Sequence, residues 1–262
     1  MQTQPTNLIG TSPRKVDAVR KVTGQTRYTG DIDLPRQLHC KLLRSTQPYA
    51  RIERIDTTAA QHQPGVVEVL TGEDFPKLFG LVTASVDERP LAVDKVRFVG
   101  DPVAAVVALT EEEAAAALHR IEVIYAPLQP VMTIAQGVAP TQDEPLHAYA
   151  ERDNVQKMLA LQFGDVDQGF AEADWLQEDL FFYEGNTHLA MEEHATLAQY
   201  EADGKLTVWS STQTPHYLHR TLADYFNLPA SRVRVIAPPT GGGFGGKAEP
   251  FNHELVVAKA AM

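Results

Sequence analysis

Cysteine is almost absent from this 262-residue chain, which contains only Cys40. A single thiol cannot form a disulfide, a four-thiolate zinc site or an iron–sulfur cluster within the chain. Any iron–sulfur centre that works with this protein must therefore lie on a partner. Because Cys40 sits in the apolar run LHCKLL, we expect it to be a small buried hydrophobic residue.

Positive charge is also scarce, with 23 Lys and Arg against 34 Asp and Glu and a net charge of −11. Phosphate binding needs clustered basic residues, so the composition argues against a nucleic-acid partner. No run approaches the roughly 18 apolar residues of a membrane span, and the first residues, MQTQPTNLIGTSPRK, lack the pattern of a signal peptide. We therefore expect a cytoplasmic protein with no membrane partner.

The first half of the sequence alternates strand-like and helix-like segments. Its strand candidates are LHCKLL, RIERID, VVEVL, KVRFVG and VAAVVAL, and TEEEAAAALHRIEVIY closes the block. Thr110 followed by three glutamates is typical of a capped helix start. This pattern predicts an α/β domain over residues 12–125, and the Pro-rich, aperiodic stretch 126–155 predicts a linker.

The second block, residues 156–262, predicts strands at LQEDLFFYE, ATLAQY, LTVWSS and RVRVIAP and a helix from Pro215 to Phe226. A last amphipathic helix in EPFNHELVVAKAAM has an apolar face but no C-cap and no element after it. Such a face needs something to pack against. We therefore expect this second domain to be incomplete in the chain.

The strongest local signal is GGGFGGK, residues 241–247, between a predicted strand and a predicted helix. Read as G-x-x-x-x-G-K it matches a phosphate-binding P-loop, but Ala248 stands where a hydroxyl should hold magnesium. Read as G-x-G-x-x-G it matches a dinucleotide loop, but the ribose-binding acid would fall beyond Met262. A purely structural turn is a third interpretation. A cofactor loop is favoured, because five glycines in six positions let backbone approach a ligand closely.

GGGFGGK, with Ser211-Thr212-Gln213 some 30 residues earlier, resembles the molybdenum hydroxylases of the xanthine oxidase family. Nearly the whole chain shares the resemblance. It implies an α+β fold, in which an α/β hammerhead domain precedes the first part of a molybdopterin-binding domain. The segments that carry it, in order, are VDAVRKVTGQTRYTGDIDLP, LLRSTQPYARIERIDTTAA, PGVVEVLTGEDFP, VGDPVAAVVAL, GDVDQGFAEAD, HLAMEEHATLA and WSSTQTPH.

Within the family the sequences of these motifs are most similar to the 4-hydroxybenzoyl-CoA reductase branch, which implies reductive dehydroxylation of an aromatic acyl-CoA. Branches that act on aldehydes, purines or carbon monoxide, and a non-catalytic assembly or binding module, are the alternatives. Purine-oxidising members carry a glutamate directly after GGGFGGK, whereas this chain has Ala248 and then Glu249. Candidates for meeting the phosphates of CoA are Arg20, Lys21, Arg27, Arg36, Lys41 and Arg44.

The resemblance implies that the amide of Gln213 donates to an oxo ligand of molybdenum, and that Gly242, Gly243, Phe244 and Gly245 line the cofactor. An amide can donate without ligating a metal, and glycine lets backbone N–H groups reach an oxyanion. No residue of the chain is implied as a direct metal ligand or as a catalytic group. The general base of the family lies in a part of the large subunit that this sequence does not contain.

The implied cofactor is molybdenum-molybdopterin, in the cytosine dinucleotide form. The implied partners are a small subunit with [2Fe-2S] clusters, an FAD subunit, the remaining C-terminal part of the molybdopterin domain, and an aromatic or CoA-thioester substrate. Alone, the chain is expected to be inactive. His188 and His194 have a spacing that favours packing or hydrogen bonding, and His216 and His219 favour surface or capping roles on one helix face over a metal site.

Overall fold

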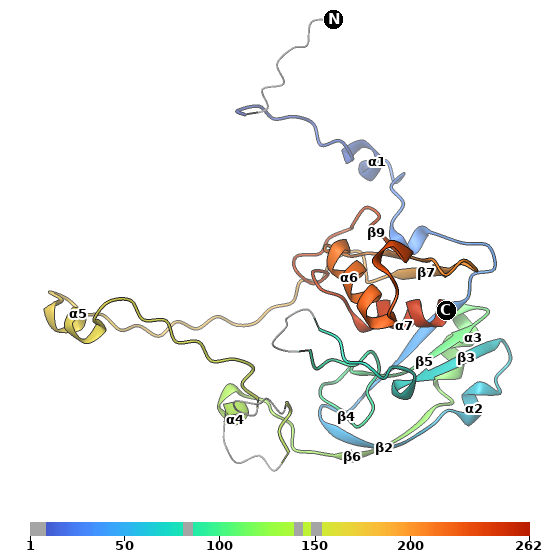
Figure 1. Ribbon diagram of the computed structural model, residues 1–262, viewed down its shortest axis with the longest axis horizontal. Helices are drawn as coiled ribbons and strands as arrows, with labels where there is room; N and C mark the ends of the chain where they lie inside the picture. The colour runs from blue at the N-terminus through green and yellow to red at the C-terminus, as the bar shows by residue number, and fades with distance from the viewer. Residues whose placement is uncertain (1–8, 81–85, 139–143, 148–153) are drawn as a thin grey trace, which may run out of the picture.

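The computed structural model describes residues 9–80, 86–138, 144–147 and 154–262 (Figure 1). Most of them form one packed body, made of strands β1 to β9 and the helices on them. A long segment between the two halves of the body leaves it and carries helix α5 at its far end. The strands form three sheets of three strands each.

The first sheet has the order β1-β5-β3 and is antiparallel, with β1 at His39–Arg44, β5 at Pro102–Ala108 and β3 at Val66–Thr71. Every residue of β5 is buried, because its sequence PVAAVVA is apolar on both faces and the strand is central. The strand predictions LHCKLL, VVEVL and VAAVVAL are confirmed.

Helix α3, at Glu111–Leu118, lies against this sheet. The Thr110 hydroxyl accepts a hydrogen bond from the Glu113 backbone N–H at 3.1 Å, and the Glu113 carboxylate accepts one from the Thr110 N–H. This capping box confirms the predicted helix start. Ala114 and Ala117 are the helix residues buried against the sheet.

The second sheet has the order β4-β2-β6, with β2 at Ala50–Asp56, β4 at Lys95–Val96 and β6 at Glu122–Pro127. RIERID is confirmed as a strand. KVRFVG forms only two strand residues, because the chain turns where the Asp101 carboxylate accepts a hydrogen bond from Arg97 N–H at 3.0 Å. The predicted strand is therefore shorter than its apolar pattern indicates.

The third sheet, with order β7-β8-β9, contains β7 at Thr196–Tyr200, β8 at Leu206–Ser210 and β9 at Val233–Ile236. β7 and β8 are antiparallel, and β8 and β9 are parallel. Helix α6, at Pro215–Phe226, makes the crossover between the parallel pair and begins with proline as predicted.

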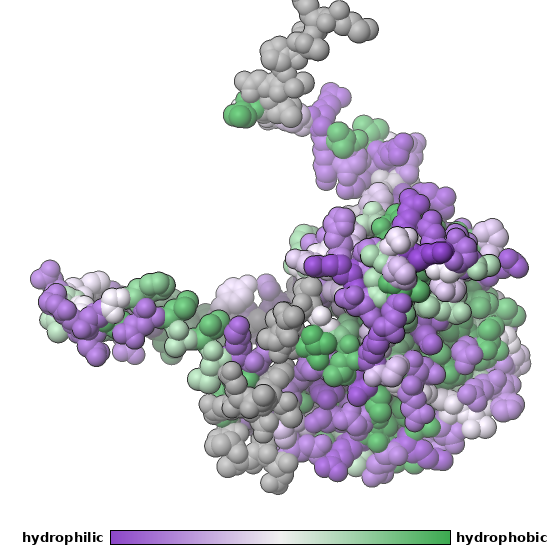
Figure 2. Space-filling model, in the orientation of Figure 1, coloured by the Kyte–Doolittle hydropathy of each residue, from purple (hydrophilic) through white to green (hydrophobic). Residues whose placement is uncertain are grey.

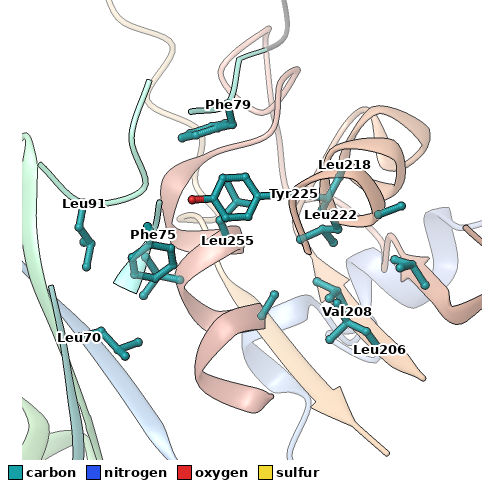
Figure 3. Close-up of a cluster of buried hydrophobic side chains, with 14 of the residues drawn as sticks. Leu70, Phe75, Phe79, Leu91, Leu206, Val208, Leu218, Leu222, Tyr225 and Leu255 are labelled. Carbon is teal, nitrogen blue, oxygen red and sulfur yellow. The ribbon is translucent and has the colours of Figure 1, made fainter. Parts of the chain in front are cut away.

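The largest hydrophobic core joins the two halves of the body (Figure 3). Helix α7, at Asn252–Ala261, buries its apolar face in this core, and the Tyr225 hydroxyl donates to the Lys77 carbonyl at 2.9 Å. The first half therefore supplies much of the packing surface that the last helix needs. The labelled core residues are Leu70, Phe75, Phe79 and Leu91 from the first half and Leu206, Val208, Leu218, Leu222, Tyr225 and Leu255 from the second.

Cys40 packs against the same core from β1, partly buried, and burial raises the pKa of its thiol to about 12. None of the helices in the described ranges is long and apolar enough to cross a membrane. The short helical elements are α1 Ala18–Val22, η1 Thr29–Asp31, α2 Thr58–Gln61, η2 Gly72–Asp74, α4 Ile134–Val138, α5 Val166–Glu172 and η3 Ala230–Arg232.

The prediction of a strand at LQEDLFFYE, residues 176–184, is wrong for this chain. These residues belong to the segment that leaves the body, residues 155–187, which we call the arm. They have no strand partner among the described residues, and Leu180 and Phe182 are about as exposed as in an unfolded chain, at 99% and 90%. A strand needs a neighbour for its backbone groups, which the apolar pattern alone cannot supply.

Candidate functional site

Three segments meet around the glycine loop, residues 241–247. The loop follows β9, and Gln213 follows β8. Because β8 and β9 are parallel, their carboxyl ends lie at the same edge of the sheet, where α/β proteins commonly bind ligands. The third segment, residues 188–194, precedes β7 and packs on the loop. The segments that adjoin β7, β8 and β9 in the sequence therefore meet at the glycine loop.

Gln213 is held by the loop at both its backbone and its side chain. Its N–H donates to the Lys247 carbonyl at 2.7 Å, and its side-chain oxygen Oε1 accepts from the N–H groups of Gly245 and Lys247 at 3.1 and 3.2 Å. These bonds fix which end of the amide faces the loop. The Nε2 group makes no hydrogen bond with any residue that the structure describes, and the residue is exposed. Gln213 therefore presents a donor away from the loop.

The loop also has three successive backbone N–H groups that form no hydrogen bond within the described ranges: those of Gly242, Gly243 and Phe244. By contrast, the preceding Gly241 N–H donates to the Glu192 carboxylate at 2.8 Å. Successive free N–H groups in a turning backbone form a concavity that favours anions. The loop can therefore bind an oxyanion at this point.

Phe244 has an unusual backbone conformation for an aromatic residue, with φ of 53°, and its side chain is 77% exposed. A non-glycine residue in the left-handed region is uncommon, and such strain often accompanies function. Its ring lies over Gly242, where an added Cβ would meet it at 3.1 Å. The loop thus displays an aromatic face beside its free N–H groups.

Three glycines of the loop are required by close contacts, and the first is Gly241, where a Cβ would lie 2.6 Å from the Cβ of Glu192. A Cβ at Gly243 would lie 2.4 Å from Gln213 Oε1, and a Cβ at Gly246 would lie 2.0 Å from the ring of His188. At Gly245 there is open space within 4 Å, and a φ of +91° is the reason for glycine. The loop therefore packs on its own chain at some positions and is open at others.

Lys247 is fully enclosed, with 2% of its surface exposed. Its ammonium Nζ donates to the Glu192 carboxylate at 2.9 Å and to the Glu192 carbonyl at 2.8 Å. A P-loop lysine must reach a phosphate, and this one is committed to a buried ion pair. The P-loop interpretation of GGGFGGK is therefore wrong, and Lys247 holds the loop to residues 188–194.

Sequence reasoning missed a buried carboxyl behind the site, Glu254 of α7. One carboxylate oxygen accepts from Phe251 N–H at 2.8 Å, and the other accepts from the hydroxyl of Ser210, the last residue of β8. Burial raises the pKa of Glu254 to about 7, against the lowering effect of these hydrogen bonds. The available signal was an acidic residue within an otherwise apolar helix face. Glu254 thereby ties α7 to the strand that carries Gln213.

His194 has the hydrogen-bonding role that its spacing favoured, since its Nε2 lies 2.8 Å from the Gly246 carbonyl. Its ring also contacts those of Phe251 and His253, with centroids 5.0 and 5.5 Å away. Burial, followed by the charges of neighbouring groups, lowers the pKa of His253 to about 3, so that this side chain stays neutral. The rings of His194, Phe251 and His253 therefore pack together, and His194 connects them to the loop through the Gly246 carbonyl.

The histidines of α6 have the kind of role that their spacing predicted. His219 Nε2 lies 3.0 Å from the Ala230 carbonyl and 3.1 Å from the Val233 carbonyl, and it therefore links α6 to the start of β9. His216 is exposed.

The basic residues proposed for CoA phosphates fall into two sets. Arg36, Lys41 and Arg44 line a groove of about 1530 Å³ between the two halves of the body. The same groove is lined by Glu88, Glu111, Glu193 and Glu249, and Lys41 is ion-paired with Glu111. The other three, Arg20, Lys21 and Arg27, do not line it. Lys21 pairs with Asp17, and Arg27 donates to the Asp31 carbonyl.

Known protein families match both parts of the chain. The molybdopterin cofactor-binding domain matches residues 146–262, and the a/b hammerhead domain of aldehyde oxidase and xanthine dehydrogenase matches residues 23–129. The α+β fold expected from the sequence is thereby confirmed. The first of these two matches includes the glycine loop and Gln213.

The chain is also similar to parts of longer chains of known enzymes. The nicotinate dehydrogenase large molybdopterin subunit of Eubacterium barkeri is 36% identical over 92% of this chain and 56% of its own length. The nicotine 6-hydroxylase large subunit of Paenarthrobacter nicotinovorans is 34% identical over 97% and 32%. The structure of quinoline 2-oxidoreductase from Pseudomonas putida 86 matches 96% of this chain and 33% of its own, with 30% identity and a TM-score of 0.85.

The chain thus spans between about a third and slightly more than half of the length of these relatives. Each match extends across both halves of the body. Because both domain matches point to the same group of enzymes, the chain belongs to the xanthine oxidase family of molybdopterin-binding large subunits.

Proposed function

We propose that this chain is part of the molybdenum-cofactor subunit of a hydroxylase-type oxidoreductase, and that Gln213 and residues 242–245 contact the cofactor. One observation carries the proposal. The loop fixes the Gln213 amide so that its donor faces outward, beside three free backbone N–H groups. The proposed domain limits remain 12–125 and 156–262, with 126–155 as the linker.

The residues present fit a molybdopterin, for which we propose the cytosine dinucleotide form. The N–H groups of Gly242, Gly243 and Phe244 can donate to its anionic oxygens, and the Gln213 amide can donate to an oxo group without binding the metal. When bound, the cofactor supplies two-electron redox chemistry. The chain's own contribution is to bind and orient. The general base is proposed to lie outside this sequence.

For the substrate we propose a nitrogen-containing aromatic ring, the class named in the nicotinate, nicotine and quinoline enzymes among the relatives. The exposed ring of Phe244 supports this choice, since it offers a planar face over Gly242, in the loop that holds the Gln213 amide. Ala248 instead of glutamate after GGGFGGK argues against a purine.

A second candidate is reductive dehydroxylation of an aromatic acyl-CoA, as in 4-hydroxybenzoyl-CoA reductase. The sequences of the motifs favour it, and so does the position of Arg36, Lys41 and Arg44, which line the same groove. Against it stand the carboxylates in the same groove, such as Glu193 and Glu249, which weaken the attraction for phosphates. The nitrogen heterocycle is therefore the first choice.

The partners proposed are a [2Fe-2S] subunit, an FAD subunit and the rest of the molybdopterin domain, in the cytoplasm. A chain with one partly buried thiol has no cluster ligands to offer, so electrons must leave through other subunits. The relatives are themselves named as subunits, which supports a multi-subunit enzyme.

The test is to express the chain together with the subunits encoded beside it and to measure molybdenum, pterin and turnover of nicotinate, quinoline and 4-hydroxybenzoyl-CoA. Gln213→Glu is the informative variant, because a carboxylate can still accept from the loop but has no N–H to donate. We expect the metal to be retained and turnover to fall roughly 100-fold or more. Gln61→Glu, at an exposed site in α2, should change neither.

Two outcomes would redirect the proposal. Turnover of the acyl-CoA alone would favour the reductase. Absence of molybdenum and pterin from the assembled complex would favour a non-catalytic assembly module.

A further inference from the structure

The arm is the part of the molecule that the proposed site leaves unexplained. It runs out from the body as extended chain on both sides of α5 (Figure 1). The hydrogen bonds of its side chains join residues within the arm, such as Asp165 with Gln168 N–H and Gln177 with Asp179. Among the described residues, no hydrogen bond joins the arm to the body.

The arm is rich in large apolar side chains, and all of them except Val155 are exposed (Figure 2). Soluble proteins rarely expose so many contiguous apolar residues unless another surface covers them. Three of them, Leu180, Phe181 and Phe182, are consecutive, so both faces of the extended chain are apolar there. The exposed set is Met158, Leu159, Leu161, Phe163, Val166, Phe170, Trp175, Leu176, Leu180, Phe181, Phe182 and Tyr183.

The comparison with solved relatives indicates what covers the arm. The quinoline 2-oxidoreductase chain matches 96% of this chain, so most of the arm has a counterpart in that structure. That chain is about three times as long as the matched part. The rest of the same fold is therefore available to enclose the counterpart of the arm.

Charge argues against a second copy of this chain as the occupant. The arm has seven acidic residues and one lysine, Lys157, and the whole chain has a net charge of −11. Like charges repel, so two copies would meet unfavourably along the arm, whereas a basic rim would attract it. The acidic residues are Asp165, Asp167, Glu172, Asp174, Glu178, Asp179 and Glu184.

We propose that the arm is the docking segment for the part of the molybdopterin-binding domain that lies outside the given sequence, an inference that rests on the proposed function. The partner surface has an apolar cleft for Trp175 and Phe181, with lysine and arginine at its rim. Residues 176–184 have the composition of a strand and no strand partner among the described residues. They add to the partner's sheet as a strand, which supplies the missing backbone partners.

The experiment places the photo-crosslinking residue p-benzoylphenylalanine at Phe181 of the full chain, in the organism that encodes it, and identifies the cross-linked peptide by mass spectrometry. The expected peptide comes from a sequence matching the molybdopterin cofactor-binding domain beyond the part that this chain contains. Leu109, an equally apolar exposed position on the body, is the control and should not give that peptide. A peptide from a second copy, or no product at Phe181, would overturn the proposal.

Variants of the full chain give an independent measurement on the isolated complex. Trp175→Ala together with Phe181→Ala should weaken association with that part of the domain, supplied as a separate polypeptide, roughly tenfold or more, as loss of aromatic anchors does. Gln177→Ala, between them in the arm, should have little effect. Equal binding by the parent chain and both variants would contradict the proposal.

Molybdenum content separates this inference from the proposed function. A cross-linked complex without molybdenum would retain the docking role and reject the function. A molybdenum-loaded complex whose arm forms no cross-link would do the reverse.

Discussion

The body and the arm contain the same kinds of residue but differ in what holds them. Leu222 in the body is fully buried in the shared core, whereas Leu180 in the arm is 99% exposed. The glycine loop is fixed by contacts to residues more than 30 positions away, and the arm has only local hydrogen bonds. The chain alone therefore determines the geometry around the glycine loop, whereas no hydrogen bond among the described residues fixes the arm to the body.

Removing the buried ammonium of Lys247 should have the largest effect on the body. Lys247→Ala leaves the enclosed Glu192 carboxylate without its cation, which costs about 3–5 kcal/mol for a buried pair. Lys157→Ala removes the same charge from the exposed arm, and should change the free energy of unfolding by less than about 0.5 kcal/mol. Urea denaturation of both variants measures the contrast. Equal losses would mean that the arm is part of the cooperative unit.

Leucine deletion compares the two regions by burial alone. Leu222→Ala removes a side chain that fills the core between β8 and α6 and should cost about 2–5 kcal/mol. Leu180→Ala should leave the unfolding free energy of the isolated chain unchanged, because the exposed side chain makes no buried contacts that the substitution would remove. Thermal unfolding followed by circular dichroism checks both. A clear loss at Leu180 would show that the arm packs on the body.

The carboxyl of Glu254 should make the stability of the body depend on pH. Its pKa is about 7 in the folded chain and near 4.5 when exposed, so folding favours the protonated form. That contribution is complete below about pH 4.5 and is lost as pH rises to about 7. The shift corresponds to about 3 kcal/mol at most.

Glu254→Gln keeps the shape and removes the titration. Relative to the parent chain, it should therefore gain stability between pH 5 and pH 8. Glu88, whose pKa burial also raises to about 7, and His253 titrate in both chains and cancel in the difference. Denaturation midpoints at the two pH values provide the measurement. A constant difference would place the Glu254 pKa near its ordinary value.

The body and the arm also differ in how far the sequence predicted them. Helix α6 and strands such as β5 were predictable, because an N-terminal proline and an apolar run act locally. The glycines of the loop predict a cofactor loop, and that role stays a prediction. Its bonds to Gln213 were not predictable, since the partners lie 32 and 34 positions apart and meet only through the parallel pairing of β8 and β9.

The arm shows the opposite limit of sequence reasoning. Residues 176–184 have the composition of a strand, yet they form none here. A strand also needs an adjacent strand to hydrogen-bond with its backbone groups, and composition does not supply one. Glu254 and Ser210 were missed for a related reason: 44 positions separate them, and only the packing of α7 behind the sheet brings them together. Local patterns predict elements, whereas contacts between distant segments determine the site.

Helix caps give the smallest and most closely matched contrast. Thr110 caps α3 in the body and Asp165 caps α5 in the arm, each accepting a hydrogen bond from the N–H three residues later, at 3.1 and 3.0 Å. Thr110→Ala should lower the global unfolding free energy by about 1 kcal/mol. Asp165→Ala should leave it unchanged, because α5 packs on nothing described and a seven-residue helix is marginal in water.

Amide hydrogen exchange should localise the Asp165 effect to α5 and spread the Thr110 effect through β1, β5 and α3, which pack together. Equal global losses in the two variants would contradict the division into body and arm. If the part of the domain proposed to dock on the arm is then added as a separate polypeptide, Asp165→Ala should begin to cost binding free energy, because ordering α5 becomes part of association. Asp165→Ala would then have no effect on the free energy of unfolding of the chain alone but a measurable effect on binding. That difference distinguishes a segment that folds on its partner from one that stays unstructured.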